Sequence, residues 1–200
     1  RIARIDRDTT QKKDSMDNFL NKMHSGDIDI LIGTQMIAKG HHFPNVTLAA
    51  IVDADSGLFS TDFRATERLA QLFMQVSGRA GRGKKKGVVI VQTYSPEHPL
   101  FHTLIKHGYN HLARSLLKER KLSSLPPHSH IALLRAEAHN IEQVKCFIKN
   151  ASAQLKQLSG DMLLLFGPIP ALIEKHAGRF RYQLIIQAAN RKLLHAHLDK

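Results

Sequence analysis

Apolar and polar positions follow two distinct patterns over the first hundred residues. Three near-continuous apolar runs are rich in β-branched side chains, which is typical of parallel strands covered on both faces: residues 28–32, 48–52 and 88–91. Residues 66–76 instead repeat apolar side chains at helical spacing, as does a segment that ends at Gly26. The inward side chains of the later helix are predicted to be Leu69, Leu72, Phe73 and Val76. Strands that alternate with helices favour a doubly wound α/β lobe, which we place at residues 1–97.

The second half has a different order of elements. A Leu-rich segment from Pro99 to Lys121 is predicted as a helix, and Leu125-Pro126-Pro127 breaks the chain after it, so residues 98–125 form a helical linker. The pattern beyond it predicts strand 131–136, helix 141–158, strand 162–166, a turn at 167–170, strand 181–187 and a helix from Arg191. The first of these helices has one apolar face, formed by Val144, Ile148, Ala151 and Leu155. Residues 126–200 are therefore predicted to form a small α+β domain.

The charge is unevenly distributed. The chain has a formal net charge of +12 and a pI near 10. Residues 1–100 carry 14 basic and 11 acidic side chains, and residues 101–200 carry 15 and 6. The excess is thus +3 in the first half and +9 in the second. Such a basic second half indicates contact with a polyanion, with nucleic acid as the first candidate and ribosome or an anionic membrane surface next.

The single cysteine and the lack of long apolar runs bear on disulfide formation, secretion and membrane spanning. Cys146 is the single cysteine, so no disulfide can form within the chain, and its helical position predicts a buried, inert side chain. No charged-then-apolar leader is present, and no apolar run approaches 18 residues. We therefore expect neither secretion nor membrane spanning, and a cytoplasmic location.

The segment Gln75-Val76-Ser77-Gly78-Arg79-Ala80-Gly81-Arg82 carries the most specific chemistry. Arg79 and Arg82 share one helical face, and each guanidinium matches phosphate oxygens with two donors. Such arginines stabilise charge on a transferring phosphoryl group. A solvated basic turn is the alternative.

The overlapping residues 78–85 resemble a phosphate loop but are one residue short, and Lys85 stands where a Ser or Thr should bind magnesium. We therefore expect half of an ATP site.

A second candidate segment follows the first predicted strand. It reads Gly33-Thr34-Gln35-Met36-Ile37-Ala38-Lys39-Gly40-His41-His42-Phe43-Pro44. Open α/β sheets bind ligands beyond the carboxyl ends of their strands. Thr34 and nearby backbone N–H groups are suited to a nucleic-acid phosphate, and the Lys39-Gly40 turn to a nucleotide. A plain strand-to-helix turn is the alternative.

These two segments resemble motifs V and VI of superfamily 2 helicases. Residues 33–44, followed by Asp53-x-Asp55 and the Asp62-to-Arg68 segment, are similar to the PriA family of primosomal replication-restart helicases. Residues 4–10 resemble the segment before motif V in that family. Leu125-Pro126-Pro127, Gly167-Pro168-Ile169-Pro170-Ala171 and Arg179-Phe180-Arg181-Tyr182 resemble its C-terminal domain. The resemblance covers nearly the whole chain.

The resemblance implies a partial RecA-like lobe of an ATP-driven 3′ to 5′ DNA helicase that recognises stalled forks and restarts replication. Arg79, Arg82 and Gln75 would act at the γ-phosphate, with Gly40 and Gly78 at the nucleotide, and Thr34, Gln35 and Lys39 would contact DNA. The family's Walker A lysine, its acidic pair and its zinc-binding cysteines match nothing here, so ATP, Mg²⁺ and Zn²⁺ would be cofactors of the intact protein. We expect these elements upstream, and we expect the chain alone not to hydrolyse ATP.

The resemblance also implies a C-terminal domain similar in fold to ribosomal protein S10. In the family this domain contributes DNA binding and contact with single-stranded DNA-binding protein. The partners implied for the intact protein are forked and single-stranded DNA, single-stranded DNA-binding protein and other primosome proteins. The candidate residues for phosphates or an acidic tail are Lys175, Arg179, Arg181 and Arg191. For Phe180 and Tyr182, stacking on bases and packing into the core remain equal alternatives.

Other residue clusters are less specific. The histidine pairs, including His41 and His42, have no carboxylate or thiolate set that completes a metal site, so we assign no metal ligands. Asp53 and Asp55 are suited either to DNA-side or interlobe contacts or to hydrogen bonds at a strand end. Two alternatives to the helicase remain: a nucleic-acid-binding module without its own ATPase, and a lobe of another superfamily 2 repair translocase.

Overall fold

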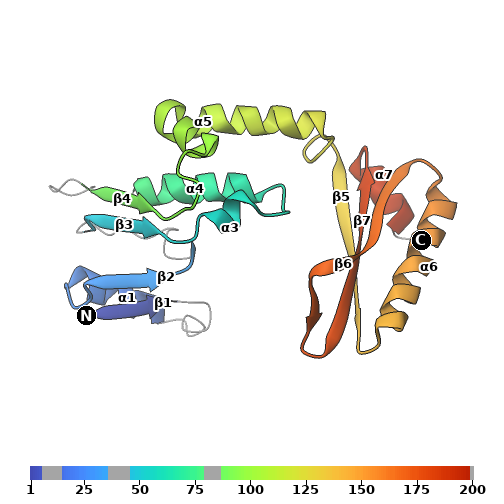
Figure 1. Cartoon of the computed structure of the whole chain (residues 1–200), viewed down its shortest axis with the longest axis horizontal. Helices are drawn as coiled ribbons and strands as arrows, with labels where there is room; N and C mark the ends of the chain where they lie inside the picture. Colours follow the sequence, from blue (N-terminus) through green and yellow to red (C-terminus); the bar gives the residue numbers. More distant parts are fainter. Residues whose placement is uncertain (6–14, 36–45, 79–86, 199–200) are drawn as a thin grey trace. The chain divides into compact units, whose positions relative to one another are not determined.

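The computed structural model describes residues 1–5, 15–35, 46–78 and 87–198 (Figure 1). The chain divides into two compact units, Arg1–Leu116 and Leu117–Lys200. The division falls inside helix α5, which spans Pro99–Leu122 and lies within the segment predicted as a helical linker. Among the described residues, every helix is too short or too polar to cross a membrane.

The first unit contains two pairs of parallel strands. Strand β1 (Ile2–Ile5) pairs with β2 (Ile30–Gly33), and β3 (Leu48–Ile51) pairs with β4 (Val88–Val91). The three strands predicted from the apolar runs are all present, with ends shifted by at most two residues. Strand β1 was not among the predictions. A mixed α/β unit with parallel pairing is confirmed.

Helix α4 packs against the β3–β4 pair of this unit, whereas Leu48, Val88 and Ile90 remain exposed. Helix α1 spans Ser15–His24, α3 spans Asp55–Leu58, and α4 spans Ala65–Ser77. Helix α4 contacts β3 and β4. The predicted inward face of α4 is confirmed, because Leu69 is buried and Leu72, Phe73 and Val76 pack against the same cluster. The buried members of this cluster are Ile51, Ala54, Leu69, Ala70, Leu100, Phe101, Leu104 and Leu112.

The long helix α5 is interrupted at a glycine. Gly108 adopts φ 74° and ψ 176°, so two helical segments meet at this residue. A positive φ of this size is open to glycine but strained for other residues. The prediction of one unbroken helix from Pro99 to Lys121 was therefore wrong at Gly108.

The second unit is an antiparallel sheet with helices on one face. Strands β5 (His130–Ala138) and β6 (Leu163–His176) flank the central strand β7 (Arg179–Ala188). Helix α6 spans Ile141–Ser159, and α7 spans Arg191–Leu198. The side chain of Asn140 caps α6 by accepting a hydrogen bond from the backbone N–H of Glu142 at 2.8 Å. The predicted order of strands and helices is confirmed.

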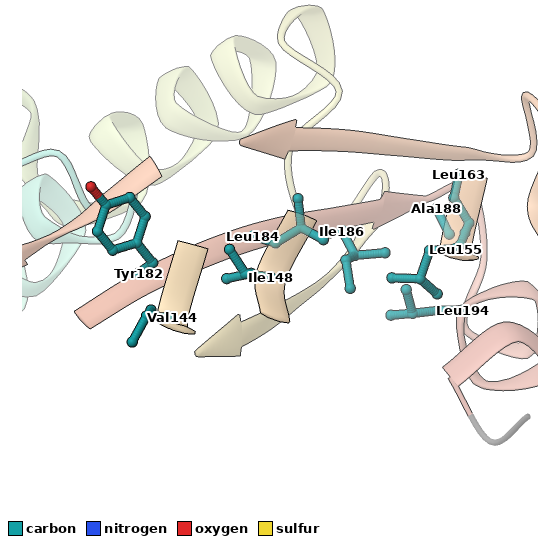
Figure 2. Packing of buried hydrophobic residues seen from close by; sticks show 9 residues of the cluster. All are labelled: Val144, Ile148, Leu155, Leu163, Tyr182, Leu184, Ile186, Ala188 and Leu194. Atoms are coloured by element: carbon teal, nitrogen blue, oxygen red, sulfur yellow. The ribbon is translucent and has the colours of Figure 1, made fainter. Parts of the chain in front are cut away.

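Burial between the helices and the sheet holds this unit together (Figure 2). The buried residues come from α6, α7, β6 and β7: Val144, Ile148, Leu155, Leu163, Tyr182, Leu184, Ile186, Ala188 and Leu194. The predicted α6 face is confirmed for Val144, Ile148 and Leu155, and Ala151 is half-buried. Each fully buried Val, Leu or Ile side chain contributes about 1.5–3 kcal/mol to the free energy of folding.

Two local predictions for this unit were wrong. Residues 167–170 do not form a turn between strands, because β6 runs through them with shifts in its pairing to β7 after Phe166 and after Pro170. Strand β6 is an edge strand, so its prolines need not donate to a neighbour on the open side. Cys146 is exposed rather than buried, because it lies two positions from Val144 and thus on the opposite side of α6.

Replacing a fully buried residue of α6 tests this core. We expect Ile148→Ala to lower the free energy of opening of the second unit by about 2–5 kcal/mol, because Ile148 is 0% exposed and a cavity remains. Native-state hydrogen exchange of the β7 amides measures that free energy for this unit alone. The neighbouring Phe147→Ala is the control, since Phe147 is 57% exposed. Equal effects of the two substitutions would contradict this packing.

Candidate functional site

One pocket in the first unit brings together residues from the two motif segments. It has a volume of about 260 Å³ and is lined by Gln35, Arg68, Gln71, Leu72 and Gln75. Gln35 lies just beyond the carboxyl end of β2, and Gln75 lies in the last turn of α4. Two of the predicted site residues, 40 positions apart in the sequence, therefore line the same space. Thr34, next to Gln35, is exposed.

Helix α4 supplies the other wall of this pocket. Arg68, Leu72 and Gln75 recur at helical spacing and so share one face. Arg68 is held by an ion pair to Asp62, with Nη1 and Oδ2 at 2.9 Å. The Gln71 amide donates to Glu67 Oε1 at 3.2 Å and to the Tyr109 hydroxyl at 3.0 Å. One guanidinium and three amides suit a polar or anionic ligand.

Arg68, Gln71 and Leu72 were missed in the sequence. They precede Gln75 by seven, four and three residues on one predicted helix, and this spacing was the signal that could have found them.

The other predicted site residues of the two motif segments do not line the described part of the pocket. Gly78 ends α4, and its backbone N–H donates to the carbonyl of Met74 at 3.0 Å. Lys39, Gly40, Arg79 and Arg82 lie outside the described residues.

Asp53 and Asp55 form hydrogen bonds at the strand ends. Asp53 accepts from the backbone N–H of Ser56 at 3.3 Å and from its hydroxyl. Asp55 accepts from the Thr93 hydroxyl and from the backbone N–H of Tyr94, each at 3.0 Å. Of the two alternatives for these aspartates, the structure favours the strand-end role, in which Asp55 ties α3 to the residues after β4.

Three of the predicted basic residues gather at the β6–β7 hairpin of the second unit. The hairpin turns at Ala177 and Gly178, whose φ values of 48° and 77° match a two-residue turn of type I′. Lys175 precedes this turn, with its Nζ 4.7 Å from the centre of the Phe180 ring. Arg179 and Arg181 follow it on β7.

Both of these arginines contact one carboxylate. Arg179 Nη1 lies 3.2 Å from Glu137 Oε1, and Arg181 Nε lies 3.1 Å from Glu137 Oε2. Glu137 pairs directly with Arg181 across β5 and β7. Sequence reasoning missed Glu137, because the pairing of two strands more than 40 residues apart is not visible in a local pattern.

The other candidates in this unit lie elsewhere. Arg191 is exposed at the start of α7, where its Nε donates to His195 Nε2 at 3.3 Å. Tyr182 is 8% exposed and belongs to the core, and Phe180 is half-buried. For Tyr182, inward packing is therefore the correct alternative. Within the described ranges, no group of three or more His, Cys, Asp or Glu side chains could hold a metal ion.

Comparison with known proteins matches one family model to a part of each unit. A family model described as the helicase conserved C-terminal domain matches residues 1–84. A second, described as the primosomal protein N C-terminal domain, matches residues 121–200. The first covers both motif segments, and the second covers the sheet that carries Arg179 and Arg181.

Individual relatives match across both units. The replication restart protein PriA of Haemophilus influenzae is 49% identical over 195 residues, which is 96% of this chain and 26% of that protein. The proteins of the same name from Synechocystis and Bacillus subtilis are each 38% identical, over 94% and 100% of this chain. The chain spans about a quarter of the length of these relatives.

Removing the Asp55 carboxylate tests its strand-end role. We expect Asp55→Ala to speed hydrogen exchange of the Tyr94 amide by roughly 10- to 100-fold, since that amide loses a charged acceptor. Exchange followed by nuclear magnetic resonance measures the effect. Asp161→Ala, at an exposed position of the second unit, is the matched control. Unchanged exchange at Tyr94 in the Asp55 variant would show that the carboxylate does not hold this segment.

Proposed function

Because the chain belongs to the PriA family of replication restart proteins, we propose that it acts as the C-terminal part of an ATP-dependent DNA helicase. In this proposal the intact, longer protein moves 3′ to 5′ along DNA, recognises stalled forks and reassembles the primosome in the cytoplasm. Matches of 38–49% identity across both units support it over a binding module without ATPase activity. The observation that carries the proposal is the pocket that Gln35 and Gln75 line together.

The first unit would supply one wall of the ATP site. In this role Gln75, Arg79 and Arg82 act at the γ-phosphate, with Gly40 and Gly78 at the nucleotide. The described part of the pocket offers Arg68 and three amides but no carboxylate. Such groups suit phosphate oxygens, whereas Mg²⁺ prefers carboxylates and water. The Mg²⁺ ligands, and those of Zn²⁺, would belong to other parts of the longer protein.

Binding of DNA would be divided between the two units. Thr34, Gln35 and Lys39 would contact the strand beside the nucleotide, so that the state of the ATP site affects the affinity for DNA. The second unit would bind DNA, single-stranded DNA-binding protein and other primosome proteins through Lys175, Arg179, Arg181 and Arg191. We propose an S10-like fold for residues 126–200, joined through residues 98–125 to the RecA-like lobe at residues 1–97.

An arginine substitution tests the proposed catalytic role. We expect Arg82→Ala in the longer protein to lower DNA-stimulated ATP turnover on the order of 10³-fold, because an arginine at the γ-phosphate stabilises charge in the transition state. Its affinity for DNA should stay within about twofold of wild type. Arg114→Ala, at an exposed position of α5, is the matched control. A turnover rate equal to that of the control would remove the assignment of Arg82.

A further inference from the structure

Within residues 117–198, one face of the sheet in the second unit carries no helix. Helices α6 and α7 pack on the face that presents Tyr182, Leu184 and Ile186. Side chains alternate along a strand, so Arg181, Gln183 and Ile185 point to the opposite face. We call this opposite side the open face.

Apolar side chains form a continuous row across the open face. Leu133 of β5 and Phe166 of β6 both pair in register with Ile185 of the central strand. Leu133 is 41% exposed and Phe166 is 49% exposed. An exposed aromatic ring on a sheet is a surface on which a nucleic-acid base can stack.

The Glu137 ion pairs lie on this face. Arg179 and Arg181 have the same parity along β7, and Glu137 is the cross-strand partner of Arg181. Each carboxylate oxygen of Glu137 receives one guanidinium, at 3.2 and 3.1 Å. Two guanidiniums that hold two oxygens of one anion present the geometry that phosphate also fits.

The carboxylate is held weakly enough to be exchanged. The side chains of Glu137, Arg179 and Arg181 are 43%, 50% and 35% exposed. Ion pairs at such exposure contribute little to stability, because solvent screens them. Arg135 is also exposed on the open face, two positions from Glu137 on β5. The local charge is therefore positive, and it becomes more so when Glu137 is displaced.

We propose that single-stranded nucleic acid lies across the open face and that one phosphate takes the place of the Glu137 carboxylate between Arg179 and Arg181. A base of the same strand stacks on Phe166. Arg181 and Ile185 are four residues apart, about 14 Å along the strand, so a short oligonucleotide reaches both sites. Glu137 thus acts as a built-in competitor that weakens binding. The inference rests on the proposed DNA-binding role of the second unit. It adds the path of the nucleic acid across the open face and the carboxylate, Glu137, that competes with its phosphate.

Substitution of Glu137 by its uncharged isostere tests the exchange. Binding of a fluorescent 12-nucleotide oligothymidylate to the whole chain is measured by anisotropy. We expect Glu137→Gln to tighten binding about 3- to 10-fold, because the phosphate no longer displaces a carboxylate. Glu142→Gln removes the same charge from the start of α6 and should change affinity less than twofold. Equal affinities of the two variants would overturn the inference.

Removal of the arginines separates this inference from the proposed function. The double variant Arg179→Gln, Arg181→Gln should bind at least about tenfold more weakly, with the salt slope reduced by about 0.7 for each phosphate that is no longer neutralised. In that background Glu137→Gln should act no more strongly than Glu142→Gln. If the double variant binds like wild type, the DNA-contact assignment fails as well. If it loses binding while Glu137→Gln matches its control, the exchange alone fails.

The stacking interaction has its own variant and control. Phe166→Leu keeps an apolar side chain but removes the ring, and it should weaken binding roughly 5- to 10-fold. Phe147→Leu changes an exposed ring on α6, away from the open face, and should have little effect. Equal effects would overturn the proposed path across Phe166.

Three further measurements complete the test. The Arg181 Nε–Hε resonance of the wild-type chain should shift on addition of the oligothymidylate. The absence of a shift would overturn the proposed exchange of Glu137 for phosphate. A polyglutamate peptide tests the other polyanion. If the arginine pair is needed for the peptide but not for the oligonucleotide, the open face binds acidic protein and the proposal is wrong. Melting curves of each variant confirm that affinities refer to folded protein.

Discussion

The alternation of side chains along β7 is the constraint on which the second unit depends. Tyr182, Leu184 and Ile186 must be buried against α6 and α7, because this burial supplies the unit's core. Once these positions point inward, Arg179 and Arg181 must point to the open face. A shift of one residue in the pairing would bury both guanidiniums and expose the core. The same pattern that stabilises the fold therefore also fixes where its cations lie.

Parallel pairing has a similar consequence in the first unit. Carboxyl ends of parallel strands lie at the same edge of a pair, so the residues after β3 and β4 meet there. Asp55 uses this proximity to accept from Thr93 and Tyr94. Gln35 follows β2 in the same way and reaches the pocket that α4 lines. The parallel pairing of strands therefore positions both the hydrogen bonds of Asp55 and the side chain of Gln35 in the pocket.

Local patterns predicted most of the elements, and the errors have separate physical causes. The apolar runs at β3 and β4 and the amphipathic face of α6 were sufficient, because burial imposes a period that a short window contains. Strand β1 was missed because four residues interrupted by Arg4 carry no clear period. Residues 167–170 were misassigned because prolines indicate a turn locally, whereas an edge strand accepts them.

The candidate site shows a division between local and long-range information. The motif segments predicted Gln35 and Gln75. Helical spacing could have indicated Gln71 as well, but not its hydrogen bond to Tyr109. Likewise the basic residues of the β6–β7 hairpin were predicted, whereas Glu137 was not, since its importance arises from the register of β5 on β7. Cys146 was wrongly assigned to the core, although the helical period alone excludes it, because Val144 and Ile148 already define the buried side of α6.

The central claim is that the first unit carries one half of an ATP site, which another part of a longer protein completes. ATP hydrolysis measured side by side on this chain and on the longer protein, with single-stranded and forked DNA, tests it most directly. The claim predicts DNA-stimulated turnover by the longer protein and none by the chain alone. Turnover by the chain alone would mean that residues 78–85 form a phosphate loop of their own and would contradict it.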